Sequence, residues 1–273
     1  MLKTRIITAC VLIACFVPAL FKLSNSYWAY AMLVLSLVAL YEWGSLIKLT
    51  KLQVSVYALV AAAIGLVIVP LIEQYGFHRF FYQSLIVFLL ATLFWLLIVP
   101  FWLKTKSHVM NKWLMSALGF LLIGSLWLAL ICAKGADPWL LLGLLATIWI
   151  ADSAAYFAGK NFGKHKLAPS ISPGKTWEGV AGALLSVTVF GFILYHFFDV
   201  KNFAIFPALW IITMLGVIGD LFESMMKRQA GIKDSGHLLP GHGGILDRID
   251  GIIPSLPIAI LMIYIYNYFA AVL

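Results

Sequence analysis

The sequence predicts an all-α, polytopic integral membrane protein with a single transmembrane domain over residues 1–273. Hydrophobic residues make up 63% of the chain, charged residues only 11%, and the mean hydropathy is +1.00. Apolar runs of about 20 residues, the length at which an α-helix crosses a bilayer, repeat from one end of the chain to the other. A soluble core needs far less apolar sequence, so no division into soluble domains is expected.

Apolar windows predict about nine transmembrane helices joined by short polar connections. They cover residues 5–22, 27–47, 54–72, 81–103, 113–133, 138–158, 178–198, 203–226 and 251–272. The first run follows Lys3 and Arg5 and loosely resembles a lipoprotein processing site at Cys15, but the same charges also orient an uncleaved helix. All three cysteines fall inside apolar runs without paired or metal-type spacing, so no disulfide is predicted.

The distribution of basic residues predicts which side of the membrane each connection faces, because Lys and Arg accumulate in cytoplasmic connections. With the N-terminus in the cytoplasm and the C-terminus on the opposite side, all 19 basic residues are cytoplasmic except Lys22, Arg79, Lys134 and Lys201. The net charge of +8 is therefore concentrated on one face. A nucleic-acid-binding protein would need a soluble basic domain or a recognition fold, and neither is predicted.

Two of the predicted helices carry acidic residues in apolar surroundings. In the sixth helix, Asp152, Tyr156 and Lys160 are four residues apart and share a face. In the eighth helix, Ser224 follows Asp220 at the same spacing. A membrane-embedded carboxylate is costly unless it is paired or bound to a metal. Each acid is therefore the partner of a neighbouring Lys or Arg or part of a functional site, and spacing alone leaves both open.

The basic loop between the sixth and seventh helices is rich in hydrogen-bond donors that suit phosphates. Its donors are Lys164, Lys166, Ser170, Ser172, Lys175 and Thr176. The triplet Gly174-Lys175-Thr176 resembles the end of a P-loop, but Pro169 stands where that motif requires a glycine. The alternative to a phosphate-binding loop is a loop that only fixes topology and ends in a helix start at Thr176.

The segment after the eighth helix is the densest polar cluster in the chain. Asp247 and Asp250 flank Arg248. Carboxylates beside basic residues suit Mg²⁺ shared with phosphate oxygens, whereas zinc would need a third ligand beside His237 and His242. Glycine permits backbone conformations closed to other residues and lets N–H groups approach an anion. The glycines in question are Gly236, Gly241, Gly243 and Gly244.

This polar segment forms one continuous pattern. It comprises Ser224, Met226, Lys227, Arg228, Lys233, Asp234, Gly236, Leu239, Pro240, His242, Gly243, Gly244, Ile245, Asp247, Arg248, Ile249 and Asp250. The pattern resembles, without departure, the C-terminal signature of phosphatidate cytidylyltransferases, also called CDP-diacylglycerol synthases. The residues around Asp152 and residues 172–179 are also similar to that family. The N-terminal half resembles it only in its string of hydrophobic helices.

The resemblance implies a Mg²⁺-dependent membrane enzyme of phospholipid biosynthesis. Such an enzyme transfers the cytidylyl group of CTP to phosphatidate and releases CDP-diacylglycerol and pyrophosphate. Its site is expected on the cytosolic face, built mainly from residues 150–180 and 216–250. The family's metal ligands carry over onto Asp220 and Asp247, with Asp250 and Asp152 as further candidates. A second cation is left open.

The remaining site residues follow from the need to hold two polyanions together. The candidates for catalysis are Asp220, Asp247, Lys227, Arg228 and Lys233. The candidates for substrate binding are Ser172, Lys175, Ser224, His242, Gly243, Gly244 and Arg248. A phosphomonoester has its second pKa near 6, so the attacking phosphate is largely dianionic and needs no strong base. His165, His237 and His242 are therefore interpreted as hydrogen-bonding or substrate-contacting residues.

The expected partners are CTP and phosphatidate in the bilayer, and no nucleic acid. A multi-pass protein of the bacterial cytoplasmic membrane is expected, and a homodimer is left open. One alternative is an enzyme that uses CTP with another lipid phosphate, such as an ether lipid. Another is a cation-coupled transporter with Asp152, Asp220 and Glu42 along its pathway. The acids cluster at one membrane face and no internal repeat is apparent, which favours the enzyme.

Overall fold

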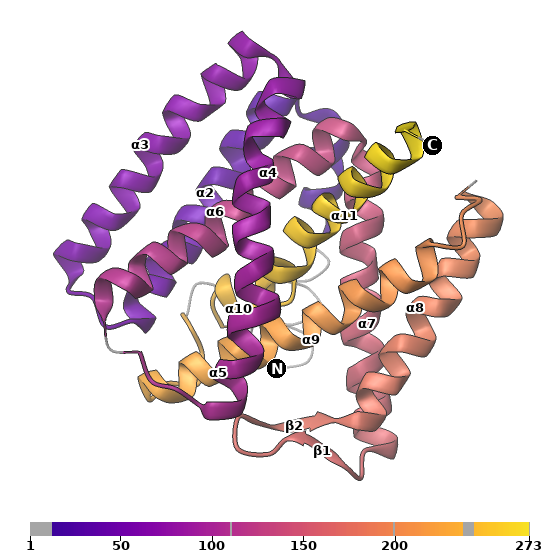
Figure 1. Cartoon of the computed structure of the whole chain (residues 1–273). Helices are drawn as coiled ribbons and strands as arrows, with labels where there is room; N and C mark the ends of the chain where they lie inside the picture. Colours follow the sequence, from indigo (N-terminus) through magenta and orange to yellow (C-terminus); the bar gives the residue numbers. More distant parts are fainter. Residues whose placement is uncertain (1–12, 110, 199, 237–242, 273) are drawn as a thin grey trace.

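The computed structural model describes residues 13–109, 111–198, 200–236 and 243–272, and it confirms the all-α membrane fold (Figure 1). A short apolar helix, Ile13–Lys22, comes first. The other elements are α2 (Asn25–Leu46), α3 (Lys51–Tyr75), α4 (Phe77–Leu93), the π-helical turn η1 (Phe94–Ile98), α5 (Val99–Thr105), α6 (Lys112–Ala136), α7 (Pro138–Phe162), β1 (Lys166–Ala168), β2 (Ser172–Thr176), α8 (Trp177–Phe197), α9 (Ile205–Ala230), α10 (Leu246–Ile249) and α11 (Ile252–Val272).

Eight helical spans among the described residues are long and apolar enough to cross a bilayer. They match the second to the ninth predicted helices, with ends that agree within about one helical turn. The helix Ile13–Lys22 coincides with the later part of the first predicted helix, whose beginning lies outside the described residues. The total of nine therefore stays a prediction.

The sequence pattern predicted one regular α-helix for the span Arg79–Thr105, but the structure differs. The π-helical turn η1 separates α4 from α5 just before Pro100. Proline has no N–H to donate to the helix ladder, and such positions commonly carry wider turns. The periodicity of apolar residues is unchanged by this local irregularity, so only the length of the span was predictable.

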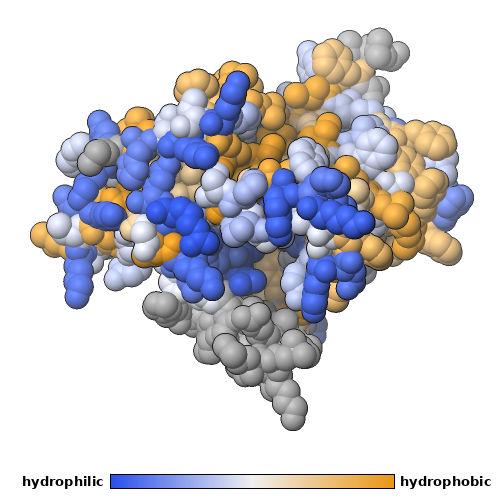
Figure 2. Space-filling view, turned by 90° about the horizontal axis from the view of Figure 1, so that it is seen from below, coloured by the Kyte–Doolittle hydropathy of each residue, from blue (hydrophilic) through white to orange (hydrophobic). Residues whose placement is uncertain are grey.

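The connections rich in basic residues lie at one end of the helix bundle, the lower end in Figure 1. They are the α2–α3 and α5–α6 connections, the β1–β2 hairpin, and the end of α9. Viewed from that end, hydrophilic residues gather across the face while apolar residues lie along its flanks (Figure 2). The asymmetry in charge along the sequence is thus an asymmetry between the two ends of the molecule. Which end faces the cytosol stays a prediction.

The basic loop predicted between the sixth and seventh helices contains a small antiparallel hairpin, β1–β2. Lys166 pairs with Thr176, and Ala168 pairs with Ser172. Thr176 then caps α8, because its hydroxyl oxygen accepts a hydrogen bond from the N–H of Gly179 at 3.1 Å. The predicted helix start at Thr176 is therefore confirmed. The strands were not predicted, since a segment such as Ser-Pro-Gly-Lys-Thr has little intrinsic β preference.

Tryptophan side chains fasten α2 to α6. The indole N–H of Trp43 donates to the carbonyl of Met115 at 2.9 Å, and that of Trp127 donates to the carbonyl of Ala29 at 2.9 Å. A Cβ on Gly119 would come within 2.4 Å of the Trp43 ring, so the two helices are in close contact there. Buried donors need partners where water is absent, and these contacts fix the position of α2.

Small residues allow the helices around the lower end to approach closely. A Cβ on Gly182 of α8 would lie 2.4 Å from the Cβ of Ala158 on α7. A Cβ on Gly219 of α9 would lie 2.3 Å from the carbonyl oxygen of Asp250, just before α11. Close packing of this kind is typical of helices in membranes. It places α7, the hairpin and the start of α11 around the end of α9.

Candidate active site

Asp220 on α9 binds the hairpin through Lys175. The Nζ atom of Lys175 lies 2.7 Å from Oδ2 of Asp220 and donates to the carbonyl of Val217 at 3.3 Å. The hydroxyl of Ser224 donates to Oδ1 of Asp220 at 3.2 Å, as their spacing by four residues predicts. The two predicted halves of the site, residues 150–180 and 216–250, therefore meet at this carboxylate.

A second cluster forms around Lys227, one turn after Glu223. Its Nζ atom lies 2.5 Å from Oε2 of Glu223 and 2.6 Å from Oδ1 of Asp247. The other oxygen of Asp247 accepts hydrogen bonds from the N–H groups of Ser235 at 3.0 Å and Gly244 at 2.8 Å. Burial raises the pKa of Asp247, but the hydrogen bonds from Lys227 and Gly244 outweigh it and bring the pKa to about 2. Asp247 is therefore a fixed anion at neutral pH.

The position of Lys227 depends on where α9 ends. The sequence predicted an end at residue 226, but the helix continues to Ala230 and stops at Gly231, whose φ is +80°. Glycine adopts this left-handed conformation without the steric cost that other residues meet. The extra turn keeps Lys227 in helical register with Glu223 and directs it toward α10.

Asp152 and Asp250 add negative charge beside Asp220. Burial raises the pKa of Asp250, and repulsion from Asp220 and Asp152 raises it further. Oδ1 of Asp250 accepts a hydrogen bond from the N–H of Gly251 at 2.8 Å. Three carboxylates thus lie within electrostatic reach of Lys175, and Arg248 is a second basic group that acts on Asp152. Such an excess of negative charge favours an additional cation.

The predicted metal ligands are held in two groups. Asp220 is paired with Lys175, whereas Asp247 is paired with Lys227. Within the described ranges, no three His, Cys, Asp or Glu side chains already converge as a metal site. The oxygen donors are nevertheless of the type that Mg²⁺ prefers, and Mg²⁺ keeps several waters and shares substrate oxygens, so it needs only one or two protein carboxylates.

Glu42 on α2 lies outside the set predicted for the enzyme site, yet it contacts the signature segment directly. Its side chain is buried, and Oε2 accepts hydrogen bonds from the hydroxyl of Ser235 at 3.0 Å and the N–H of Leu246 at 2.8 Å. Oε1 accepts a hydrogen bond from the N–H of Ile245 at 3.0 Å. An acid near the predicted cytoplasmic end of an apolar helix was the available signal, but the neighbouring sequence did not indicate its partners.

The other predicted substrate-binding residues surround these clusters. Arg228 and Lys233 are exposed at the end of α9 and just beyond it, and Ser172 is half-buried in β2. Arg248 on α10 acts electrostatically on Asp152. His242 lies outside the described residues. The described members therefore lie at the same end of the molecule, and their contacts with substrate stay predictions.

His165 makes hydrogen bonds within the protein, which is one of the two roles that the sequence left open for it. Its Nδ1 atom lies 2.6 Å from Oε1 of Glu178, and its N–H also approaches that carboxylate. The carbonyl of His165 accepts a hydrogen bond from the N–H of Trp177 at 3.0 Å. The histidine therefore ties the start of the hairpin to the first turn of α8.

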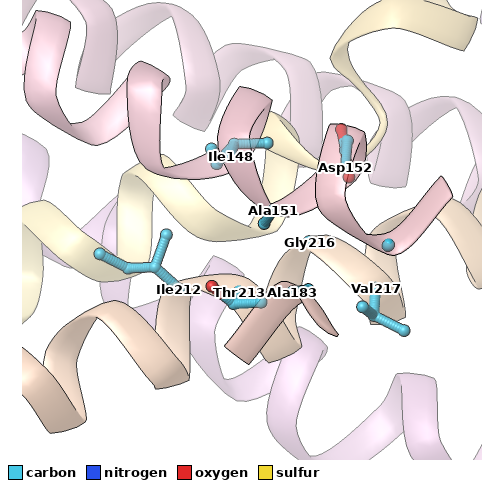
Figure 3. A pocket seen from close by; sticks show the side chains of 9 residues that line it. Ile148, Ala151, Asp152, Ala183, Ile212, Thr213, Gly216 and Val217 are labelled. Carbon is cyan, nitrogen blue, oxygen red and sulfur yellow. The ribbon is translucent and has the colours of Figure 1, made fainter. Parts of the chain in front are cut away.

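Two spaces lie within the bundle, and only the smaller one has a residue of the acidic cluster in its lining. A small pocket between α7, α8 and α9 has Asp152 on one side and Gly216 and Val217 on the other (Figure 3). A larger, mainly apolar cavity of about 980 Å³ lies between α7, α8, α9 and α11. Ile212 lines both spaces. The larger cavity therefore begins near the middle of α9 and runs toward the opposite end of the bundle, where Asp137 and Asn202 line it.

Fold and site together define an integral membrane enzyme whose carboxylates and lysines gather at one end of a helix bundle. The model of the cytidylyltransferase family matches residues 3–266, so the chain belongs to this family. A phosphatidate cytidylyltransferase of Haemophilus influenzae is 36% identical, over 94% of this chain and 96% of that protein. A protein of that name from Pseudomonas aeruginosa is 34% identical, over 94% of this chain and 95% of that protein. Another from Staphylococcus saprophyticus is 33% identical, over 97% of this chain and 100% of that protein.

These comparisons confirm the family that the polar segment predicted, and they extend the likeness through the N-terminal half. The match to the family model therefore covers residues outside the signature as well as the polar segment itself. That includes α2, which brings Glu42 to the site.

Proposed function

We infer that the chain is a phosphatidate cytidylyltransferase. It transfers the cytidylyl group of CTP to phosphatidate and forms CDP-diacylglycerol and pyrophosphate. The similarity to enzymes of that name over nearly the whole chain carries this conclusion. The juxtaposition of Lys175, Asp220, Lys227 and Asp247 supplies groups that suit the reaction. Cation-coupled transport has no corresponding support, since Glu42 is hydrogen-bonded within the structure.

The reaction is a displacement at phosphorus. A phosphate oxygen of phosphatidate attacks the α-phosphorus of CTP, and a new P–O bond forms. The bond from the α-phosphorus to the oxygen that bridges it to the β-phosphorus breaks, and the electron pair leaves with pyrophosphate. Because the attacking phosphate is largely dianionic at neutral pH, no protein base is required. His165 can therefore stay in its contact with Glu178.

Mg²⁺ is proposed as the cofactor, held by Asp220 and Asp247 with Asp152 and Asp250 as further ligands. Burial is the main cause of the raised pKa of Asp250, and repulsion from Asp220 and Asp152 adds to it; that neighbouring negative charge supports the assignment. When bound, the metal ion neutralises phosphate charge and orients the reacting groups. A second cation would have the same carboxylates available.

The lysines have a second role in this proposal. Lys175 and Lys227 now neutralise the carboxylates of Asp220 and Asp247. Carboxylates that hold a cation no longer depend on these ammonium groups, so both lysines become available to the phosphates of the substrates. Arg228, together with the other basic residues of the signature, would add to this stabilisation of transferred charge.

The lipid substrate needs space for its acyl chains, and the cavity of about 980 Å³ between α7, α8, α9 and α11 supplies it. Its walls are mainly apolar, and it adjoins the pocket beside Asp152 through Ile212. A headgroup at the acidic cluster and chains in the cavity would suit the two halves of phosphatidate. We propose that this end of the protein faces the cytosol, where CTP is present, in the bacterial inner membrane.

One assay tests the activity and the cofactor together. Detergent-purified protein is incubated with labelled CTP, phosphatidate and Mg²⁺, and we expect CDP-diacylglycerol and pyrophosphate in equal amounts. EDTA should stop both products. No CDP-linked lipid and no pyrophosphate would overturn the activity, whereas full turnover in EDTA would overturn only the metal. An ether-linked lipid phosphate in a parallel reaction reports whether the enzyme accepts that alternative.

A further inference from the structure

We propose that Glu42 is a positioning residue, through which α2 holds the signature segment in its reactive conformation. Its side chain is 5% exposed and lies among backbone groups of residues 235–246. Glu42 touches neither of the lysines that pair with the proposed metal ligands. Its effect on turnover would pass through Asp247, so the inference rests on the proposed function for the role of that residue.

Two carboxylates bind the same two stretches of chain. Asp247 accepts the N–H groups of Ser235 and Gly244. Glu42 accepts the Ser235 hydroxyl and the N–H groups of Ile245 and Leu246. All five donors come from one stretch at Ser235 and another at 244–246. Holding these stretches together from α2 therefore fixes the donors that orient Asp247.

Two signature glycines fit closely against Glu42. A Cβ on Gly236 would come within 2.4 Å of Oε1 of Glu42, and a Cβ on Gly244 would come within 2.4 Å of Oε2. Only glycine allows the backbone this near to the carboxylate. The sequence pattern predicted glycines that let N–H groups approach an anion, and at Gly244 and its neighbours the anion is a side chain of the protein itself.

The backbone of α2 beside Glu42 is held in place by contacts with α6. The indole N–H of the neighbouring Trp43 donates a hydrogen bond to the Met115 carbonyl of α6, so the α2 backbone is held in place next to the carboxylate. A buried carboxylate that receives three hydrogen bonds holds its donors tightly, because losing any of them leaves charge without compensation. The contact therefore transmits the packing of the N-terminal helices to the segment that carries Asp247.

The decisive variant is Glu42→Gln, which keeps the volume of the side chain. Gln has one acceptor oxygen, and its amide group would oppose an N–H donor of the segment. We expect kcat per folded protein to fall by about 10- to 100-fold, the range seen when residues that orient metal ligands are replaced. The Mg²⁺ concentration for half-maximal rate should rise, while KM for CTP changes less. Ser235→Ala, which removes one contact, should shift both quantities in the same direction but less.

Ser36→Ala is the matched control, since Ser36 is another buried polar residue of α2 away from the segment. It should leave kcat and the Mg²⁺ requirement unchanged. Folded fraction is measured by size-exclusion chromatography and tryptophan fluorescence. Wild-type kcat in Glu42→Gln, or a loss that matches the loss of folded protein, would overturn the proposal. If Glu42→Gln does not fold, a wild-type Mg²⁺ requirement and kcat in Ser235→Ala would overturn it.

The same series separates this inference from the proposed function. If the wild-type enzyme needs no divalent cation, the metal proposal fails. The kcat of the folded variants would still decide whether Glu42 positions the segment. A double substitution of Glu42 and Ser235 adds a further criterion. Residues that act through one contact give effects that are not additive, whereas independent effects would add.

Discussion

At the scale of single residues, the site is built from lysine–aspartate pairs that link distant parts of the chain. Lys175 from the hairpin meets Asp220 on α9, and Lys227 near the end of α9 meets Asp247 on α10. The pair with Lys227 compensates the buried carboxylate of Asp247, which would otherwise be costly, whereas Asp220 is more exposed. A pair of this kind can also be opened by a competing cation or phosphate, which suits a site that must bind both.

Asp220→Ala should abolish turnover while membrane insertion stays intact. The substitution removes the carboxylate that Lys175 and Ser224 contact, together with the proposed metal ligand. We expect a fall in kcat of about 100-fold or more, as for removal of a group that stabilises transferred charge. Pyrophosphate release by detergent-purified protein measures it.

Glu73→Gln provides the matched control, because Glu73 is an exposed acid on α3, far along the chain from the signature. It should retain wild-type turnover. Asp247→Ala should behave as Asp220→Ala does. Near-wild-type activity in either aspartate variant would contradict the metal assignment.

The sequence indicated candidate site residues but not the contacts they make. Asp220, Ser224 and Asp247 were candidates because spacing by four and carboxylate chemistry are local signals, and their roles stay predictions. The contact of Lys175 with Asp220 was expected only as two loops facing each other. Glu42 could not be assigned to the enzyme site, since its partners lie about 200 residues away and its own surroundings are ordinary apolar helix.

At the scale of elements, the helices were predictable and their junctions were not. Runs of apolar residues define a span by length alone, so the eight described spans match their predictions. The hairpin β1–β2 and the extra turn of α9 depend on tertiary contacts and on one glycine conformation. These are the elements that place Lys175 and Lys227, so the site geometry rests on the less predictable part of the fold.

Gly219→Ala tests the contact between α9 and the start of α11. The new Cβ would lie 2.3 Å from the carbonyl oxygen of Asp250 and 2.8 Å from a ring carbon of Pro254. Backbone must therefore shift, and we expect a loss of about 1–3 kcal/mol in stability, typical of overpacking. Turnover per folded protein should also fall, because Asp250 moves relative to Asp220. Thermal unfolding in detergent and the cytidylyl transfer assay measure the two effects.

Gly124→Ala is the control for this prediction. Gly124 also lies in a membrane-spanning helix, α6, but a Cβ there meets no atom within 4 Å. Alanine favours helix more than glycine does, so unfolding should occur at the same or a higher temperature. Equal behaviour of the two variants would show that the close approach at Gly219 carries no structural cost.

At the scale of the whole molecule, the basic connections and the candidate site lie at the same end of the helix bundle. The connections rich in Lys and Arg gather there (Figures 1 and 2). Lys175 of the hairpin and Lys227 near the end of α9 contact the two acidic clusters. The sequence predicted this segregation because basic residues alternate with apolar spans in a regular order. It could not predict that α2 reaches the C-terminal signature, since contact between distant helices leaves no periodic signal.

The proposed orientation places Lys164 in the cytosol and Lys201 outside, and both side chains are exposed. Single cysteines at these positions, in a cysteine-free and active background, would be labelled in intact cells with a membrane-impermeant maleimide. We expect Lys201→Cys to react in intact cells and Lys164→Cys to react only after the membrane is opened. Basic connections resist translocation, which is the physical reason for this order.

The opposite labelling pattern would place the acidic site away from the cytosol and its CTP, and the proposed location would fail. Labelling of both cysteines in cells whose membrane excludes the reagent would mean that the protein inserts in two orientations, which contradicts a fixed cytosolic site. Because Lys164 leads into the hairpin that carries Lys175, the experiment orients the catalytic end directly. If Lys164 is cytosolic and the enzyme turns over, the basic end of the molecule faces the compartment that contains CTP. The charge asymmetry of the chain would then explain the location of the site.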